Sequence, residues 1–107
     1  MDERRFHSLA DATLSQWLER LEPFYDRGDF EELDLADGVL TIQTRSGRTL
    51  ILNRHGASQQ LWLAAPRSGG FHFSYDETGQ EWKLADGELL SLMMVRELAA
   101  EGINVAA

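Results

Sequence analysis

The 107 residues are 43% hydrophobic and 26% charged, with a formal net charge of −8, a composition that predicts one globular domain over residues 1–107. The absence of cysteine excludes disulfides, thiolate metal sites and cysteine nucleophiles. No apolar run approaches the roughly 20 residues of a membrane span, and the first residues lack a signal-peptide core. We therefore expect a cytoplasmic protein that does not bind membranes. An acidic chain also repels phosphates, so we expect no binding to nucleic acid.

The first predicted element is a helix over residues 3–22. Apolar side chains recur at steps of three and four from Phe6 to Leu21, which gives the helix one apolar face. Pro23 should end it, because the residue before a proline is disfavoured in helical conformation. Residues 23–30 should then form a connector. Four polar residues share another face of this helix: Asp11, Ser15, Glu19 and Glu22.

Six short strands should follow, each bounded by turn residues. Asp37-Gly38 between the first two is a strong hairpin signal. Alternation points Leu61 and Leu63 inward and leaves Trp62 on the opposite face, where Asn53, Arg54 and Gln60 would surround it. The expected strands cover residues 30–36, 39–44, 48–54, 59–65, 71–75 and 81–84.

The last predicted element is a helix over residues 86–101 with a broad apolar band, capped by Asp86 at its start and followed by Gly102. Helix, consecutive strands and helix predict an α+β fold. Both helices should cover one face of a five- or six-stranded antiparallel sheet and leave the other face in water. Trp62 on that face is a candidate partner anchor, unless a loop or the chain end covers it.

Charge is unevenly distributed along the chain. Residues 1–37 hold eleven acids and four arginines, residues 38–75 hold four arginines and no acid, and residues 76–107 hold seven acids and two bases. This segregation predicts an acidic pole and a neutral or basic pole. The densest acidic run consists of Glu19, Glu22, Asp26, Asp29, Glu31, Glu32, Asp34 and Asp37.

Three interpretations of this run stay open. It is a solvated face, a weak site for hard cations such as calcium, magnesium, manganese or iron, or a docking surface for a basic partner. The spacing lacks the pattern of a calcium-binding EF-hand loop. Motifs of the common hydrolases and nucleotide-binding enzymes are missing, and the three histidines show no ligand spacing.

Five stretches resemble bacterial frataxins of the CyaY type, in the family's order and over nearly the whole chain. They are FHSLAD at residues 6–11, GVLTI at 38–42, LNR at 52–54, QLWLA at 60–64 and GGFHF at 69–73. The resemblance implies a two-layer α/β sandwich that regulates iron–sulfur cluster assembly. Such a protein docks on the cysteine desulfurase and near the scaffold protein.

The resemblance also implies weak surface binding of iron (Fe²⁺ or Fe³⁺), with other divalent cations possible, by a protein that is monomeric without iron. The metal ridge carried over to this chain comprises Glu19, Glu22, Asp26, Asp29, Glu31, Glu32 and Asp34, with Asp11 as a weaker member. The partner contact on the sheet face comprises Asn53, Gln60 and Trp62.

Three departures from the family pattern bear on this interpretation. Pro23-Phe24-Tyr25 stands where the family is often acidic, Arg27 adds a positive charge, and His55 replaces a glutamine. If His55 lies near Trp62, it would tune docking with pH or offer a metal ligand. Two alternative functions are a ferroxidase or iron store, which needs carboxylates held rigidly together, and a protein-binding module with no metal role.

Overall fold

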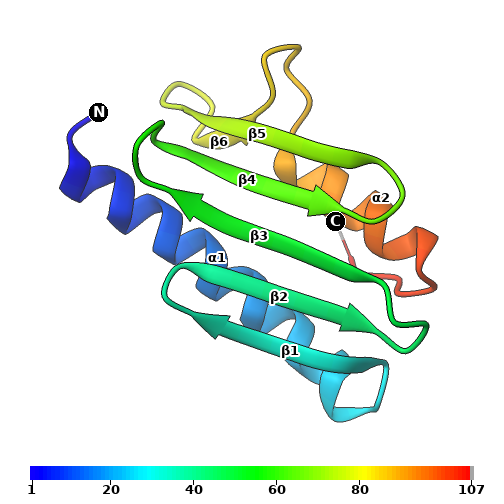
Figure 1. Ribbon diagram of the computed structural model, residues 1–107. Coiled ribbons are helices and arrows are strands. Elements are labelled where there is room, and N and C mark those ends of the chain that lie inside the picture. Colours follow the sequence, from blue (N-terminus) through cyan, green and yellow to red (C-terminus); the bar gives the residue numbers. More distant parts are fainter. Residues whose placement is uncertain (107) are drawn as a thin grey trace.

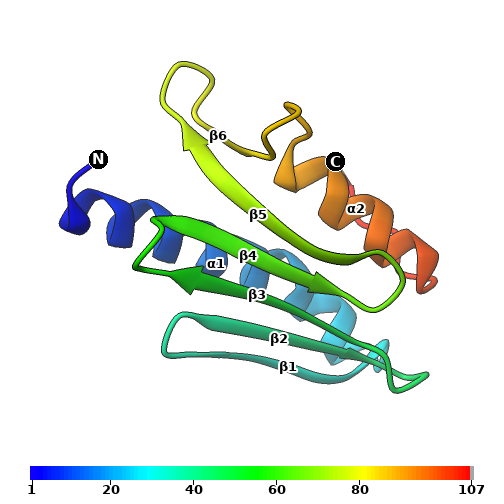
Figure 2. The same ribbon diagram turned by 45° about the horizontal axis from the view of Figure 1, so that its top comes forward.

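Two helices lie against one face of a six-stranded antiparallel sheet in the computed structural model, which describes residues 1–106 (Figure 1). The strands stand in chain order, and both views place the two helices on the same side of the sheet (Figures 1 and 2). This confirms the predicted α+β sandwich. The elements are α1 (Glu3–Asp26), β1 (Phe30–Ala36), β2 (Val39–Thr44), β3 (Thr49–His55), β4 (Gln60–Ala65), β5 (Gly69–Asp76), β6 (Glu81–Lys83) and α2 (Leu90–Ala100).

The core lies between the helices and the inner face of the sheet. Period-two alternation buries Leu40 and Ile42 on β2 and Leu61 and Leu63 on β4, as predicted. The Asp37-Gly38 hairpin also forms as predicted, with φ angles of 52° and 75° that match a primed turn. From α1, the core receives Phe6, Ala10, Leu14, Trp17 and Leu21.

Helix α1 continues through Pro23 to Asp26, so the predicted end at residue 22 and the connector from residue 23 are wrong. A proline in the last turn removes one N–H bond, but its carbonyl still accepts from the backbone N–H of Arg27 at 3.2 Å. Phe24, half-buried, packs against the core. That burial offsets the local cost and carries Asp26 into the helix.

Helix α2 begins at Leu90 rather than at Asp86, because the intervening residues serve the sheet edge. The Asp86 carboxylate accepts from the backbone N–H of Glu88 at 2.9 Å, which favours a turn. Leu89 forms a β-bridge with Lys83. The predicted end holds, with Gly102 at a φ of 84°, but the apolar band is narrower than expected because Leu92 is 52% exposed.

Strand boundaries differ little from the prediction, except that β5 begins at Gly69 instead of residue 71. Ala65 pairs with Gly69, so only three residues form the connection between β4 and β5. No helix among the described residues has both the length and the apolar character needed to cross a membrane.

Candidate functional site

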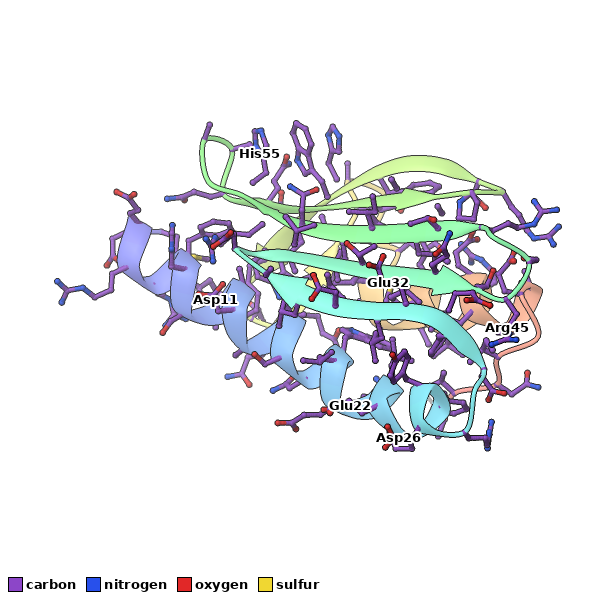
Figure 3. All side chains as sticks on the ribbon, turned by 60° about the horizontal axis from the view of Figure 1, so that its bottom comes forward. Asp11, Glu22, Asp26, Glu32, Arg45 and His55 are labelled. Carbon is purple, nitrogen blue, oxygen red and sulfur yellow. The ribbon has the colours of Figure 1, made fainter. Side chains whose placement is uncertain are left out.

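The acidic ridge is our name for Asp11, Glu19, Glu22, Asp26, Asp29, Glu31, Glu32 and Asp34. Figure 3 shows Asp11, Glu22 and Asp26 on α1 and Glu32 on β1. Glu19, Glu22 and Asp26 follow helical steps of three and four, so they share one side of α1. All of the ridge except half-buried Asp29 is exposed. The ridge therefore spans the boundary between the helix layer and the first strand.

Three ridge carboxylates have cationic partners. Asp11 pairs with Arg54, Asp29 with Arg27 at 2.6 Å, and Glu31 with Arg45 at 3.3 Å. The others form no ion pair or side-chain hydrogen bond with any residue in the described part of the chain. The unpaired acids are Glu19, Glu22, Asp26, Glu32 and Asp34. No positive side chain compensates their negative charge within the described residues.

The ridge offers hard oxygen donors without a preformed cage. Across residues 1–106, no three histidine, aspartate or glutamate side chains converge closely enough to hold a metal ion. Glu32 and Asp34 pair with Gln43 and Thr41 on the outer sheet face, whereas the α1 acids belong to the helix layer. The donor set suits iron, magnesium or calcium, with one or two carboxylates and water completing the coordination.

The pole that was expected to be neutral or basic carries little free positive charge, because all four arginines of residues 38–75 contact acids. Arg45 and Arg54 pair with ridge acids, and Arg48 and Arg67 both approach Glu101, at 3.7 and 2.6 Å. Charges that are segregated in the sequence are therefore interleaved in space. Five acids of the ridge, on α1 and β1, remain without an ion pair in the part of the chain that the structure describes.

The outer sheet face brings together Asn53, Gln60 and Trp62, since Asn53 pairs directly with Trp62 across β3 and β4. The indole N–H of Trp62 donates to Gln60 Oε1 at 3.0 Å, and Gln60 Nε2 donates to Ser74 Oγ at 3.2 Å. Arg54 lies on the opposite face, where it reaches Asp11, so its expected place around Trp62 is wrong.

Trp62 is sandwiched between two histidines. Its indole stacks on His55 at a centroid distance of 3.6 Å and on His72 at 4.1 Å, with interplanar angles of 8° and 10°. His55 Nδ1 lies 2.7 Å from Ser58 Oγ. Both faces of the indole are therefore covered, and a partner meets ring edges. The sequence left the proximity of His55 to Trp62 as a condition, which the structure meets. The place of His72 requires the β4–β5 register, which puts it opposite Trp62.

Two buried carboxylates on and just after α2 escaped the sequence prediction. The Glu101 side chain is 2% exposed and accepts from Arg67 Nε at 2.6 Å, while Glu97 accepts from Ser68 at 2.8 Å. Their spacing of four residues, opposite arginine-containing turns, was the available signal. They fix the end of α2 to the β2–β3 and β4–β5 turns.

Two carboxylates beyond β5 have lowered pKa values. A hydrogen bond from Lys83 Nζ at 2.8 Å, together with backbone N–H groups of Thr78 and Gly79, lowers the pKa of Asp76. The side-chain hydrogen bond from Arg5 lowers the pKa of Glu77, and Glu77 raises that of Arg5. These pairs fasten the start of α1 and the β5–β6 hairpin, away from the ridge.

Comparisons with known proteins agree with this geometry. A family model described as a frataxin-like domain matches residues 1–103. The iron-sulfur cluster assembly protein CyaY of Pseudomonas syringae is 47% identical over 97 residues, which cover 90% of this chain and 84% of that protein. Its counterpart in Pseudomonas fluorescens is 45% identical over 106 residues, which cover 98% and 92%.

Solved structures show the same fold. Frataxin from Psychromonas ingrahamii superposes with a TM-score of 0.82 at 23% identity, covering 98% of this chain and 96% of that one. A ferrous complex of trimeric frataxin from yeast superposes with a TM-score of 0.75 at 27% identity, covering 87% and 84%. The chain belongs to the frataxin-like family.

Proposed function

We propose that this protein is an iron-binding regulator and adaptor of iron–sulfur cluster assembly that docks on the cysteine desulfurase and the scaffold protein. The names of relatives at 47% and 45% identity support the pathway, and the ferrous complex of yeast frataxin supports the metal. The protein acts in the cytoplasm, as a monomer when iron is absent.

The unpaired ridge carboxylates are the observation that carries the docking proposal. Glu19, Glu22 and Asp26 repel one another at helical steps of three and four, and they oppose the dipole at the end of α1. Each such effect costs a few tenths of a kcal/mol. A basic partner surface would relieve this repulsion, so the same charges that weaken the isolated fold strengthen the complex.

Iron binding follows from the same carboxylates. One or two exposed carboxylates with water make a weak site, and a basic partner competes for them. Ferroxidase chemistry asks for carboxylates fixed rigidly around the metal. The spread of the ridge over two layers therefore favours a non-enzymatic role.

The outer sheet face supplies a second contact, which we assign to the scaffold protein. Asn53 and Gln60 present uncharged polar groups beside the ring edges of the His55–Trp62–His72 stack. Aromatic residues of this kind are frequent anchors at protein interfaces.

Calorimetry with the purified cysteine desulfurase tests docking. The variant Glu22→Lys/Asp26→Lys should bind at least about tenfold more weakly at low salt, with a shallower dependence on salt, because the ridge supplies the attraction. Glu3→Lys/Glu81→Lys changes net charge equally away from the ridge and should bind nearly as well as the unmodified chain. Equal loss in both variants would reduce the effect to net charge and contradict a docking ridge.

Nuclear magnetic resonance tests the metal. Ferrous ion added without oxygen should broaden amide signals of residues 19–34, and Glu22→Lys/Asp26→Lys should lessen the broadening around α1. Uniform or absent broadening would support the metal-independent module instead.

A pull-down of the scaffold protein with and without iron, using Trp62→Ala, tests the sheet-face contact.

A further inference from the structure

Half of the outer edge of β5 has no neighbouring strand. β6 pairs only with Ser74–Asp76, whereas Gly69–Phe73 pairs with β4 on one side and with no strand on the other, in the part of the chain described. Figures 1 and 2 show β6 beside only one end of β5. The sheet therefore has an open edge on the side opposite β1.

The direction of the backbone groups along this edge follows from one hydrogen bond. Leu84 N–H donates to the Glu88 carbonyl at 2.9 Å in the bridge between Lys83 and Leu89, so the backbone groups of Leu84 point away from β5. By alternation, the backbone N–H and C=O groups of Lys83 point toward Ser74. The backbone groups of Ser74 in turn point toward β6.

The same alternation carries along β5. The N–H and C=O groups of Gly70 and His72 face the same side as those of Ser74, which beyond β6 is the open edge. No residue in 1–106 forms a hydrogen bond with these edge-facing groups. The two N–H donors and two C=O acceptors of Gly70 and His72 therefore have the spacing of a strand edge and can pair with an added strand.

Nothing in the local sequence blocks this edge. The β1 edge carries Glu31, Glu32 and Asp34, the usual protection against strand addition, but residues 69–73 read Gly-Gly-Phe-His-Phe. A methyl group built on Gly70 would meet no atom within 4 Å. A groove of about 380 Å³ runs along the edge, lined by Gly70, Phe71, His72, Leu84, Ala85 and Asp86.

We propose that this edge binds an extended peptide segment of a partner protein, which adds to the sheet as an antiparallel strand beside β5. The peptide residue opposite His72 exchanges two backbone hydrogen bonds with it and places its own side chain beside the imidazole. The residues on either side turn toward the helix layer near Phe71 and Leu84, so they are apolar.

The charge of the protein also restricts the charge of the peptide segment that can bind at this edge. With a net charge of −8 and Asp86 in the groove wall, the chain favours a neutral or basic segment over an acidic one. Stacking on Trp62 holds the His72 ring on the outer face, so the backbone of His72 stays accessible. The acidic ridge lies at the opposite edge of the sheet, so both surfaces can be occupied together.

The probe is the peptide acetyl-Lys-Val-Thr-Val-Lys-amide, which places two valines on one side and basic residues at both ends. Titrated into the ¹⁵N-labelled protein, it should shift the amide signals of Gly70 and His72. Gly70→Ala keeps the N–H group and should bind as well. Gly70→Pro removes that donor without touching the β4–β5 ladder, and should lower affinity about tenfold.

Backbone methylation of the peptide supplies a test that needs no protein variant. N-methylation of the threonine blocks its edge-facing N–H and should abolish the shifts, while N-methylation of the second valine, whose N–H points away from β5, should preserve them. Shifts confined to α1 and β1, equal binding of both methylated peptides, or no shift at millimolar peptide would overturn the proposal. So would a dimer in sedimentation that Gly70→Pro dissociates, since the edge would then serve a second copy.

Discussion

The imidazole of His55 lies parallel to the indole of Trp62, with 3.6 Å between ring centroids and 8° between ring planes. Aromatic pairs in such contact contribute about 0.5–1.5 kcal/mol beyond area burial. We expect a double-mutant cycle of His55→Ala and Trp62→Ala to give a coupling free energy in that range, measured by urea unfolding. The His7 ring contacts Phe6 edge-on, so His7→Ala with Trp62→Ala should show no coupling. Coupling of equal size in both cycles would contradict a specific stack.

Paired and unpaired ridge acids should affect stability with opposite signs. Glu22→Gln removes repulsion from Asp26 and an unfavourable charge near the end of α1, so it should raise the free energy of unfolding by about 0.3–0.5 kcal/mol. Asp11→Asn weakens the contact with Arg54 and should lower it. Urea unfolding at low salt measures both. If both variants changed the free energy of unfolding in the same direction, ion pairing would not distinguish stabilising from destabilising acids of the ridge.

Gly38 has a left-handed backbone conformation and lies close to the side chain of Arg54. Its φ is 75°, and a methyl group there would lie 2.8 Å from Arg54 Cζ. Gly38→Ala should therefore lower the free energy of unfolding by about 2 kcal/mol, with contributions from backbone strain and from the displaced guanidinium. In an Arg54→Ala background only the strain remains, so the cost should fall. An unchanged cost in that background would remove the steric part of this explanation.

Glu101 holds the end of α2 through a carboxylate that is 2% exposed. Glu101→Gln keeps its shape but removes the charge that faces Arg48 and Arg67, and should lower the free energy of unfolding by about 1–2 kcal/mol. The matched control is Arg96→Ala, which breaks an exposed pair with Glu88 and should cost less than about 0.5 kcal/mol. Equal costs in urea unfolding would mean that burial of Glu101 adds nothing.

Acid should weaken the fastening of α1 to the β5–β6 hairpin. The pKa values of Asp76 and Glu77 lie below their ordinary values of 3.8 and 4.5, so their contribution is present above pH 4.5 and is lost as pH falls through the lowered pKa values. Arg5→Met removes the cause of the Glu77 shift. Its stability should be lower above pH 4.5 and decline less steeply below it than in the unmodified protein.

Urea midpoints across this pH range measure that slope. Arg4→Met removes a neighbouring arginine that forms no ion pair within residues 1–106, and its midpoints should run parallel to those of the unmodified protein. A parallel course for Arg5→Met as well would contradict the assignment to Glu77.

Local patterns predicted the strands well, because alternation and turn residues act over a few positions. Leu61, Leu63 and the Asp37-Gly38 hairpin depend on little else. The extension of α1 beyond Pro23 was missed because Phe24 finds its packing partners only in the assembled core. Asp86 reads equally as a helix cap or as a turn residue, and the bridge between Lys83 and Leu89 selects the turn.

The sequence names the acids of the ridge, but it does not show which of them are paired and which are unpaired. Asp11 meets Arg54 across 43 positions of sequence, a contact that depends on how β3 lies over α1. The His72 stack likewise needs the β4–β5 register. Such contacts are fixed by the tertiary arrangement, which neither periodicity nor composition encodes locally.

The asymmetry between the two edges of the sheet also bears on filament formation. Copies that join through strand edges can grow into a filament only if each copy offers two accepting edges. Here β1 carries Glu31, Glu32 and Asp34 and is irregular between Phe30 and Glu32, so it repels an incoming strand of another copy. Growth stops after a single addition at β5, and the open edge carries little risk of fibril formation.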